Sequence, residues 1–198
     1  MFFNRNQLTI LKETRKFVKE YMNNLEDISH DYNHIKLVVK YASKIAKKEG
    51  IRNSRDLFQI RMGALLHDIG DHKYSNESQK KVLSRFLNRF ERLGKMDKRE
   101  IIKIASNVSL SLEDGRKNKK LDVVKDADRI NSLGAIGIMR YISYNIINSP
   151  SPSFNEIVKN MRQRTKKIMR HLKTQTGKEL SKKHLHLISL FLNNYKGF

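Results

Sequence analysis

Histidine and aspartate side chains gather in two short segments in the first half of the chain. Four of the seven histidines lie in the strings SHDYNH at positions 29–34 and HDIGDHK at positions 67–73. Mixed imidazole and carboxylate ligands suit a divalent transition metal such as Mn²⁺, Co²⁺, Ni²⁺ or Fe²⁺, with Mg²⁺ as a further possibility, and they leave positions open for water and a substrate oxygen. Two histidines on separate helices and two aspartates would meet that need.

A single histidine on a helix is more often a hydrogen-bonded core or surface residue than a metal ligand. The stronger signal is the apolar run that ends in His67 and Asp68. These polar groups follow Leu65 and Leu66 directly, and a buried polar atom without a partner costs roughly 1–3 kcal/mol. A bound metal would satisfy both groups.

The composition excludes several other kinds of site. The chain has no cysteine, which rules out disulfides, thiolate zinc sites, iron–sulfur clusters and a cysteine nucleophile and fits a reducing compartment. No stretch approaches the roughly 18–20 apolar residues of a membrane span, and the first residues lack a hydrophobic signal core. We therefore expect a cytoplasmic protein with no membrane partner.

The chain is strongly basic, with 41 Lys and Arg against 20 Asp and Glu and a formal net charge of +21. Such a charge favours polyanionic partners, either nucleic acid or phosphorylated metabolites. An AT-rich genome would produce the same excess of lysine, which would then only solvate helix faces. Composition leaves both explanations open.

Helices must position the candidate ligands. Nine glycines and two prolines in 198 residues are few for a turn-rich β protein, and apolar residues recur at helical spacing. We predict an all-α protein with a single domain over 1–198, a core at about 7–148 and a basic C-terminal helical appendage at about 153–195. The spacing predicts helices over 7–22, 34–46, 54–66, 82–93, 97–108, 121–144, 154–173 and 177–195.

Several helix ends can be predicted from capping residues. Asp31 can cap the second of these helices and Ser54 the third, while capping boxes at 97–100 and 153–156 would open the fifth and the seventh. Gly134 and Gly137 fall inside the long sixth helix, and we expect them to allow close approach of a neighbouring helix. The segment 113–120 carries no apolar side chain and is expected to be an exposed loop.

Taken together, these residues resemble the H…HD…D signature of the HD-domain metal-dependent phosphohydrolase superfamily. The strings SHDxxH at 29–34, HDIxDxK at 67–73, and DADR at 126–129 followed by GAIGI at 134–138 resemble its short stand-alone YpgQ/YedJ-like branch. The resemblance covers roughly residues 7–195. It implies a helical bundle of about five core helices with additional C-terminal helices.

The resemblance also implies a ligand set. His34, His67, Asp68 and one later aspartate would hold the metal. Asp126 and Asp128 lie about 200° apart around a helix, so both cannot face one ion. The superfamily pattern Ala-Asp-x-Leu selects Asp128, which leaves Asp126 as a partner of a ligand histidine or as a helix-start residue.

Further roles follow from the same resemblance. Asp71 would join Asp68 at the catalytic centre and orient the attacking water, unless it is a simple helix-end carboxylate. Lys73 would bind a substrate phosphate, although a solvated lysine is the ordinary alternative. Arg129 would bind phosphate or pair with Asp126, and we favour the pair.

Two positions depart from the family pattern. Leu37 stands where members often carry arginine, and Asn107 lies near the position where a histidine is common. A phosphate contact is therefore lost or relocated, and Asn107 could hydrogen-bond to a substrate but would be a poor ligand for a second metal.

The favoured function is a metal-dependent phosphohydrolase acting on a phosphate ester or anhydride. A nucleotide is the preferred substrate, cleaved by a nucleoside triphosphate pyrophosphohydrolase or nucleotidase reaction. The alternative from a different class is a basic helical protein that binds nucleic acid and keeps only a vestigial HD site. A third, weaker option is a regulatory HD module.

Overall fold

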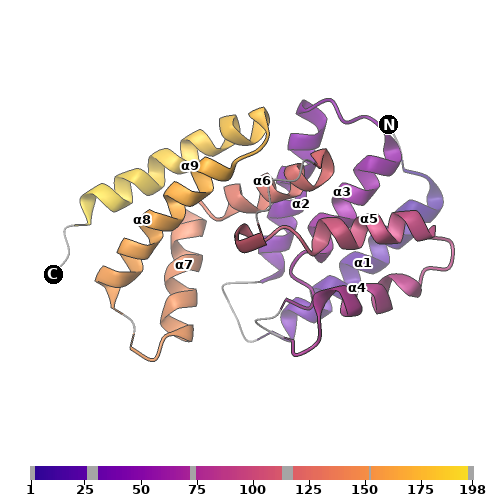
Figure 1. The fold of residues 1–198 in the computed structure, drawn as a ribbon, viewed down its shortest axis with the longest axis horizontal. Helices are drawn as coiled ribbons and strands as arrows, with labels where there is room; N and C mark the ends of the chain where they lie inside the picture. Colours follow the sequence, from indigo (N-terminus) through magenta and orange to yellow (C-terminus); the bar gives the residue numbers. More distant parts are fainter. Residues whose placement is uncertain (1–2, 26–30, 72–74, 113–117, 152, 196–198) are drawn as a thin grey trace.

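Amphipathic segments of the sequence form α-helices in the computed structural model (Figure 1), which describes residues 3–25, 31–71, 75–112, 118–151 and 153–195. No strand occurs within these ranges, so the predicted all-α class is confirmed. The helices are α1 (Arg5–Asn23), α2 (Tyr32–Lys48), α3 (Ser54–Leu66), α4 (Gln79–Asn88), α5 (Lys95–Ala105), the 3₁₀ turn η2 (Leu110–Leu112), α6 (Lys119–Asn131), α7 (Gly134–Asn148), α8 (Phe154–His171) and α9 (Gln175–Asn194).

Helices α1, α5 and α6 pack against α2 or α3, and α4 packs against α5. One apolar cluster joins α1, α3 and α4 and includes Leu11, Phe58 and Leu66; a second joins α2, α3 and α6 and includes Val38 and Val124. Burial of such side chains is the main force that holds helices of this kind together. Because α2 packs against both α3 and α6, residues on these three helices can meet at one point.

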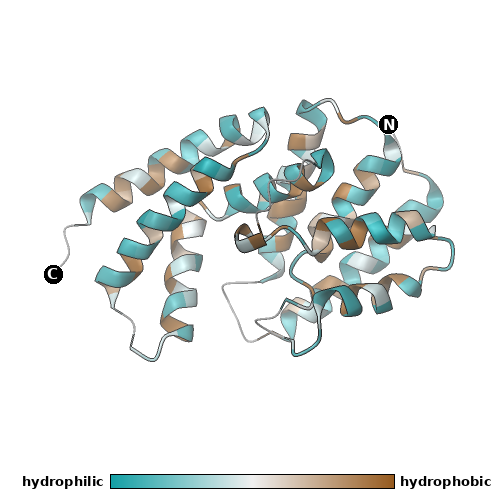
Figure 2. Cartoon of the chain, in the orientation of Figure 1, coloured by the Kyte–Doolittle hydropathy of each residue, from teal (hydrophilic) through white to brown (hydrophobic). Residues whose placement is uncertain are grey.

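Helices α7, α8 and α9 lie to one side of this bundle (Figure 1). They share a third apolar cluster that includes Leu133, Met161 and Ile188. Figure 2 shows hydrophilic and apolar residues on most of the helices, as expected for amphipathic helices with one solvent-facing side. No helix in the described ranges is both long and apolar enough to cross a lipid bilayer.

The prediction of one helix over 121–144 is wrong, because the chain turns between α6 and α7. Gly134 has a φ of +71°, a left-handed conformation that costs glycine little and other residues considerably more. A side chain there would also collide with the imidazole of His184 on α9, and one at Gly137 would collide with the backbone of Ser132. The two glycines thus allow a tight turn, and only Gly134 also allows the expected close approach of another helix.

Several predicted helix caps also differ from those in the structure. Asp31 caps α2 as expected, accepting a hydrogen bond from the backbone N–H of His34 at 2.9 Å, but Asn53 rather than Ser54 caps α3. The two capping boxes are not formed: Gly94 and Ser153 precede α5 and α8, each without a side-chain capping bond. Asp97 instead accepts hydrogen bonds from two side chains of α3, because a guanidinium there offers a charge-assisted bond that a backbone amide does not.

Candidate metal centre

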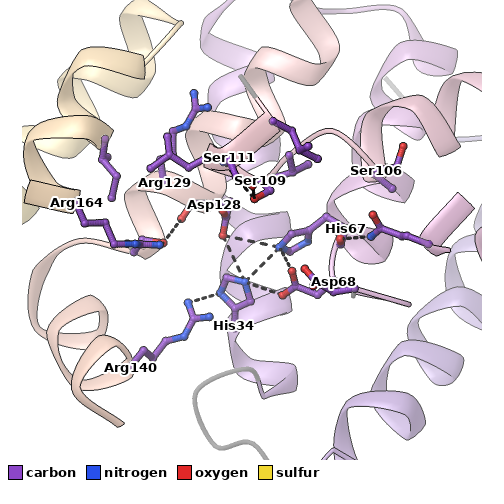
Figure 3. Close-up of a pocket in the computed structure, with 18 of the residues that line it drawn as sticks. His34, His67, Asp68, Ser106, Ser109, Ser111, Asp128, Arg129, Arg140 and Arg164 are labelled. Carbon is purple, nitrogen blue, oxygen red and sulfur yellow. Dashed lines mark hydrogen bonds and ion pairs between the residues drawn. The ribbon is translucent and has the colours of Figure 1, made fainter. Parts of the chain in front are cut away.

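Three separate segments carry the four predicted ligands. His34 lies in the first turn of α2, where the Asp31 cap orients the backbone. His67 is the residue at the C-terminal end of α3, Asp68 follows it, and Asp128 lies near the end of α6. Figure 3 shows the two imidazoles and the two carboxyl groups pointing toward one another.

The donor atoms of these residues are close enough to share one ion. His34 Nε2 lies 3.3 Å from His67 Nε2 and 3.2 Å from Asp68 Oδ2. His67 Nε2 lies 3.3 Å from Asp68 Oδ1, and Asp128 Oδ1 lies 3.5 Å from His34 Nε2 and 3.8 Å from His67 Nε2. An ion about 2.1 Å from each donor places neighbouring donors roughly 3.0–3.4 Å apart. The arrangement therefore fits a divalent transition metal, with His34, His67 and Asp68 as the tightest group.

Burial sets the protonation state of the first histidine. His34 is 3% exposed, and desolvation lowers its pKa from 6.5 to about 4, because water no longer stabilises the imidazolium; hydrogen bonding to Asp68 opposes this and the charge of Arg140 adds to it. His34 is thus neutral at pH 7. A neutral imidazole is the form that binds metal ions.

The second histidine is oriented by the main chain of its own helix. His67 Nδ1 lies 3.0 Å from the carbonyl oxygen of Ala64. A carbonyl can only accept, so Nδ1 carries the hydrogen and Nε2 keeps its lone pair for the centre. Gln79 of α4 donates to the carbonyl of His67 at 2.6 Å, which holds the end of α3 in place.

A cavity of about 380 Å³ lies beside the four donors. Its wall includes Arg140 of α7 and Arg164 of α8, and Figure 3 shows both arginines at the same side of the centre. Burial lowers the pKa of Arg164, with Asp128 opposing the shift. An anion that enters this cavity would replace hydration that the guanidinium has lost.

Neither arginine was predicted as a site residue from the sequence. Arg140 follows the segment GAIGI by two positions, and Arg164 is one of many basic residues on α8. Periodicity places neither side chain in the cavity, because each reaches it only through the packing of α7 and α8 on the bundle. The sole available signal for Arg140 was its closeness to a glycine-rich turn, where side chains often line functional sites.

Other predicted site residues are placed as follows. Asp71 lines the cavity together with Asp68. Lys73 lies outside the described residues. Arg129 lies 3.6 Å from Asp126 and donates to the carbonyl of His171 at 2.5 Å, so the favoured pair with Asp126 is confirmed. Part of Arg129 also lines the cavity, which leaves a phosphate contact as a prediction.

Besides its pair with Arg129, Asp126 has neither of the two roles that were predicted for it as the aspartate turned away from the metal. It is fully buried and accepts hydrogen bonds from the backbone amides of Lys173 and Thr174 and from the Thr174 hydroxyl. It is neither a partner of a ligand histidine nor the start of α6, because the side of α6 opposite the centre faces the turn between α8 and α9. The contact to His34 comes instead from Asn131, five residues later.

The two departures from the family pattern differ in their surroundings. Asn107 donates to the carbonyl of Lys103 and to Ser106 and does not line the cavity, although Ser106 does. Leu37 is half-buried on α2. The cation near His34 comes from Arg140, whose Nη1 lies 2.6 Å from His34 Nδ1.

Residues 31–133 match the HD domain family, a segment that contains all four candidate ligands and covers just over half of the chain. The chain belongs to the HD domain family. Curated relatives include an uncharacterised protein of Acanthamoeba polyphaga mimivirus, 31% identical over 153 residues, and the uncharacterised protein YpgQ of Bacillus subtilis, 28% identical over 141 residues. The matches cover 70% and 68% of this chain but only 63% and 65% of those longer proteins.

Solved HD-type structures extend the likeness to the last three helices. Bacillus subtilis YpgQ in complex with ADP has a TM-score of 0.78 at 22% identity, covering 96% of this chain and 95% of that one. An HD-superfamily hydrolase from Bacillus thuringiensis has a TM-score of 0.73 at 25% identity and covers 96% of each chain. The predicted HD-type fold with C-terminal helices, and its likeness to YpgQ, are therefore confirmed.

Proposed function

We propose that this HD-domain protein is a divalent-metal-dependent phosphohydrolase that acts on a phosphate ester or anhydride, with a nucleotide as its substrate. The observation that carries the proposal is the convergence of His34, His67, Asp68 and Asp128 beside a cavity walled by arginines. The four residues would hold the ion. The arginines would bind the phosphate.

A divalent ion at this centre supplies Lewis acidity to a phosphoryl oxygen and lowers the pKa of water toward neutrality. Arg140 and Arg164 contribute fixed positive charge on one side of the cavity, where negative charge grows on the transferring group. Asp71 offers a carboxylate on the cavity wall and would orient the attacking water and accept its proton. Through its guanidinium, Arg140 would also supply the phosphate contact that Leu37 cannot make.

Two observations support a nucleotide. The cavity of about 380 Å³ lies within the range of about 300–1,000 Å³ that is typical of small-molecule sites. The structurally similar YpgQ has been solved with ADP. The most suitable metals are Mn²⁺, Co²⁺, Ni²⁺ and Fe²⁺, because they accept both imidazole and carboxylate.

The proposal is tested by stripping the purified protein with EDTA and reloading it with Mn²⁺, Co²⁺, Ni²⁺ or Mg²⁺. Release of phosphate and pyrophosphate is then measured across nucleoside mono-, di- and triphosphates. We expect activity to disappear on stripping and to return with at least one transition metal. If no metal raises the release above that of the stripped protein, the proposal is wrong.

Nucleic-acid binding is a second candidate, favoured by the exposed basic side chains of α8 such as Lys159, Lys166 and Arg170. Binding that depends on these charges would weaken steeply with salt and would be insensitive to EDTA. Oligonucleotide binding, measured with and without EDTA beside the hydrolysis panel, separates the two functions, because hydrolysis needs the metal and electrostatic binding of a polyanion does not.

The position of Arg164 in the wall of the cavity leads to a specific prediction. Replacing Arg164 with methionine is expected to raise the KM for the phosphorylated substrate about tenfold or more, since hydrogen bonds to charged groups contribute about 1.5–3 kcal/mol. Lys166→Met is the matched control, because Lys166 is an exposed cation on the same helix. Steady-state kinetics of both variants decide the matter. Equal KM values for Arg164→Met, Lys166→Met and the wild type would show that Arg164 does not contact the substrate.

A further inference from the structure

Two side chains approach the outer nitrogen of the His34 ring. The amide nitrogen Nδ2 of Asn131 and Nη1 of Arg140 each lie 2.6 Å from His34 Nδ1, and the same amide nitrogen lies 3.4 Å from the carbonyl oxygen of His34. Asn131 is the last residue of α6 and is 4% exposed, so this contact is buried. The other ring nitrogen, Nε2, faces His67, Asp68 and Asp128.

A neutral imidazole carries one hydrogen, and its position decides which nitrogen can bind a metal ion. For Nε2 of His34 to bind, the hydrogen must sit on Nδ1 and be donated to an acceptor. The guanidinium of Arg140 can only donate. The Asn131 amide faces the ring with its nitrogen, but the oxygen and nitrogen of an amide have nearly the same shape, so a half-turn of the group presents the oxygen instead.

We propose that Asn131 is the positioning residue that selects the metal-binding tautomer of His34, in competition with Arg140; this inference rests on the metal centre of the proposed function. When the amide oxygen of Asn131 accepts from Nδ1–H, the lone pair of Nε2 points to the centre. When Arg140 donates to Nδ1, the hydrogen moves to Nε2 and blocks it. Metal binding at His34 therefore requires that Arg140 give up its hydrogen bond to Nδ1.

The two histidines differ in this respect. The Ala64 carbonyl, which can only accept, already sets the tautomer of His67. At His34 the choice depends on a side chain that can be replaced without altering the backbone. Among the residues that contact the two histidines, we therefore expect substitution of Asn131 to change metal binding the most.

The test is a titration of the EDTA-stripped, full-length protein with Co²⁺, followed by calorimetry and by visible absorption. Asn131→Leu, which cannot accept a hydrogen bond, is expected to bind Co²⁺ about 10–100-fold more weakly than the wild type, the range found for such outer partners of metal-bound histidines. Asn131→Asp, which only accepts, is expected to bind at least as tightly as the wild type. Thermal unfolding followed by circular dichroism shows which variants fold.

Two arginine variants distinguish an effect on the tautomer of His34 from a general effect of positive charge near the metal centre. Arg140→Met and Arg164→Met each remove one cation from the cavity wall, but only Arg140 contacts His34. We expect Arg140→Met to bind Co²⁺ more tightly than Arg164→Met does.

Either of two results would overturn the role of Asn131 while leaving the metal centre intact: wild-type affinity in folded Asn131→Leu, or weakened binding in Asn131→Asp. If Asn131→Leu does not fold, the aspartate variant and the arginine pair decide the question, and equal affinities of the two arginine variants count against competition by Arg140. Failure of the wild type itself to bind Co²⁺ would instead contradict the proposed function.

Discussion

Asp68→Ala is expected to lower the metal-dependent kcat/KM by at least about 10³-fold, equivalent to about 4 kcal/mol of transition-state stabilisation. The Asp68 carboxyl group lies 3.2 Å from His34 Nε2 and 3.3 Å from His67 Nε2. Its removal deletes a negatively charged donor from the centre of the ligand set. The remaining donors would hold a divalent ion weakly, and the protein would lose both its metal and its activity.

The same variant should remain folded, because α2, α3 and α6 are held together by apolar side chains. Metal content by atomic absorption, the melting temperature and the steady-state rate are measured side by side. Glu91→Ala removes an exposed carboxylate in the loop after α4 and should change none of the three. A fully active, metal-loaded Asp68→Ala protein would exclude Asp68 as a ligand.

Asp126→Ala is expected to give the largest loss of stability, about 3–5 kcal/mol in the free energy of unfolding. The carboxylate is fully buried, accepts hydrogen bonds from three donor groups of Lys173 and Thr174, and lies 3.6 Å from the Arg129 guanidinium. Alanine would remove the acceptor of the Lys173 and Thr174 donors and the negative charge beside the buried Arg129 guanidinium. The turn between α8 and α9 would lose its main polar contact with α6.

Urea unfolding followed by circular dichroism measures this effect. Asp126→Asn keeps one acceptor oxygen and is expected to lie between alanine and the wild type. Glu13→Ala, on the exposed side of α1, serves as the control and is expected to change stability by less than about 0.5 kcal/mol. A loss below about 1 kcal/mol in Asp126→Ala would show that Asp126 does not anchor the C-terminal helices.

The helices that carry the candidate site could largely be predicted from local patterns. Apolar spacing places α2 and α3 within about two residues of their observed bounds, because an amphipathic stripe and its capping residues act over one or two turns. The same reasoning failed between α6 and α7. The break there depends on the left-handed backbone of Gly134, and His184 of α9, which is 50 positions away in the chain, leaves no room for a side chain at that position.

The two aspartates of α6 likewise show what local helix geometry predicts and what only the packing of the helices decides. Their separation around the helix excludes both from one ion, and that conclusion needs only helix geometry. Which of them faces the histidines depends on the side of α6 that packs against α2. In the structure Asp128 faces His34 and Asp126 faces Thr174. The contact of Asp126 could not be predicted without knowing where the turn between α8 and α9 lies.

By itself, the sequence determined the types of donor, their spacing along the chain and the helices that carry them, since residue chemistry and helical periodicity are local properties. Only the tertiary structure decided that Arg140 and Arg164 wall the cavity and that Asn131 contacts His34. The chain contains 41 basic residues, and their sequence contexts are too similar to distinguish these two. What distinguishes them is the packing of helices remote in sequence, which depends on the whole apolar core at once.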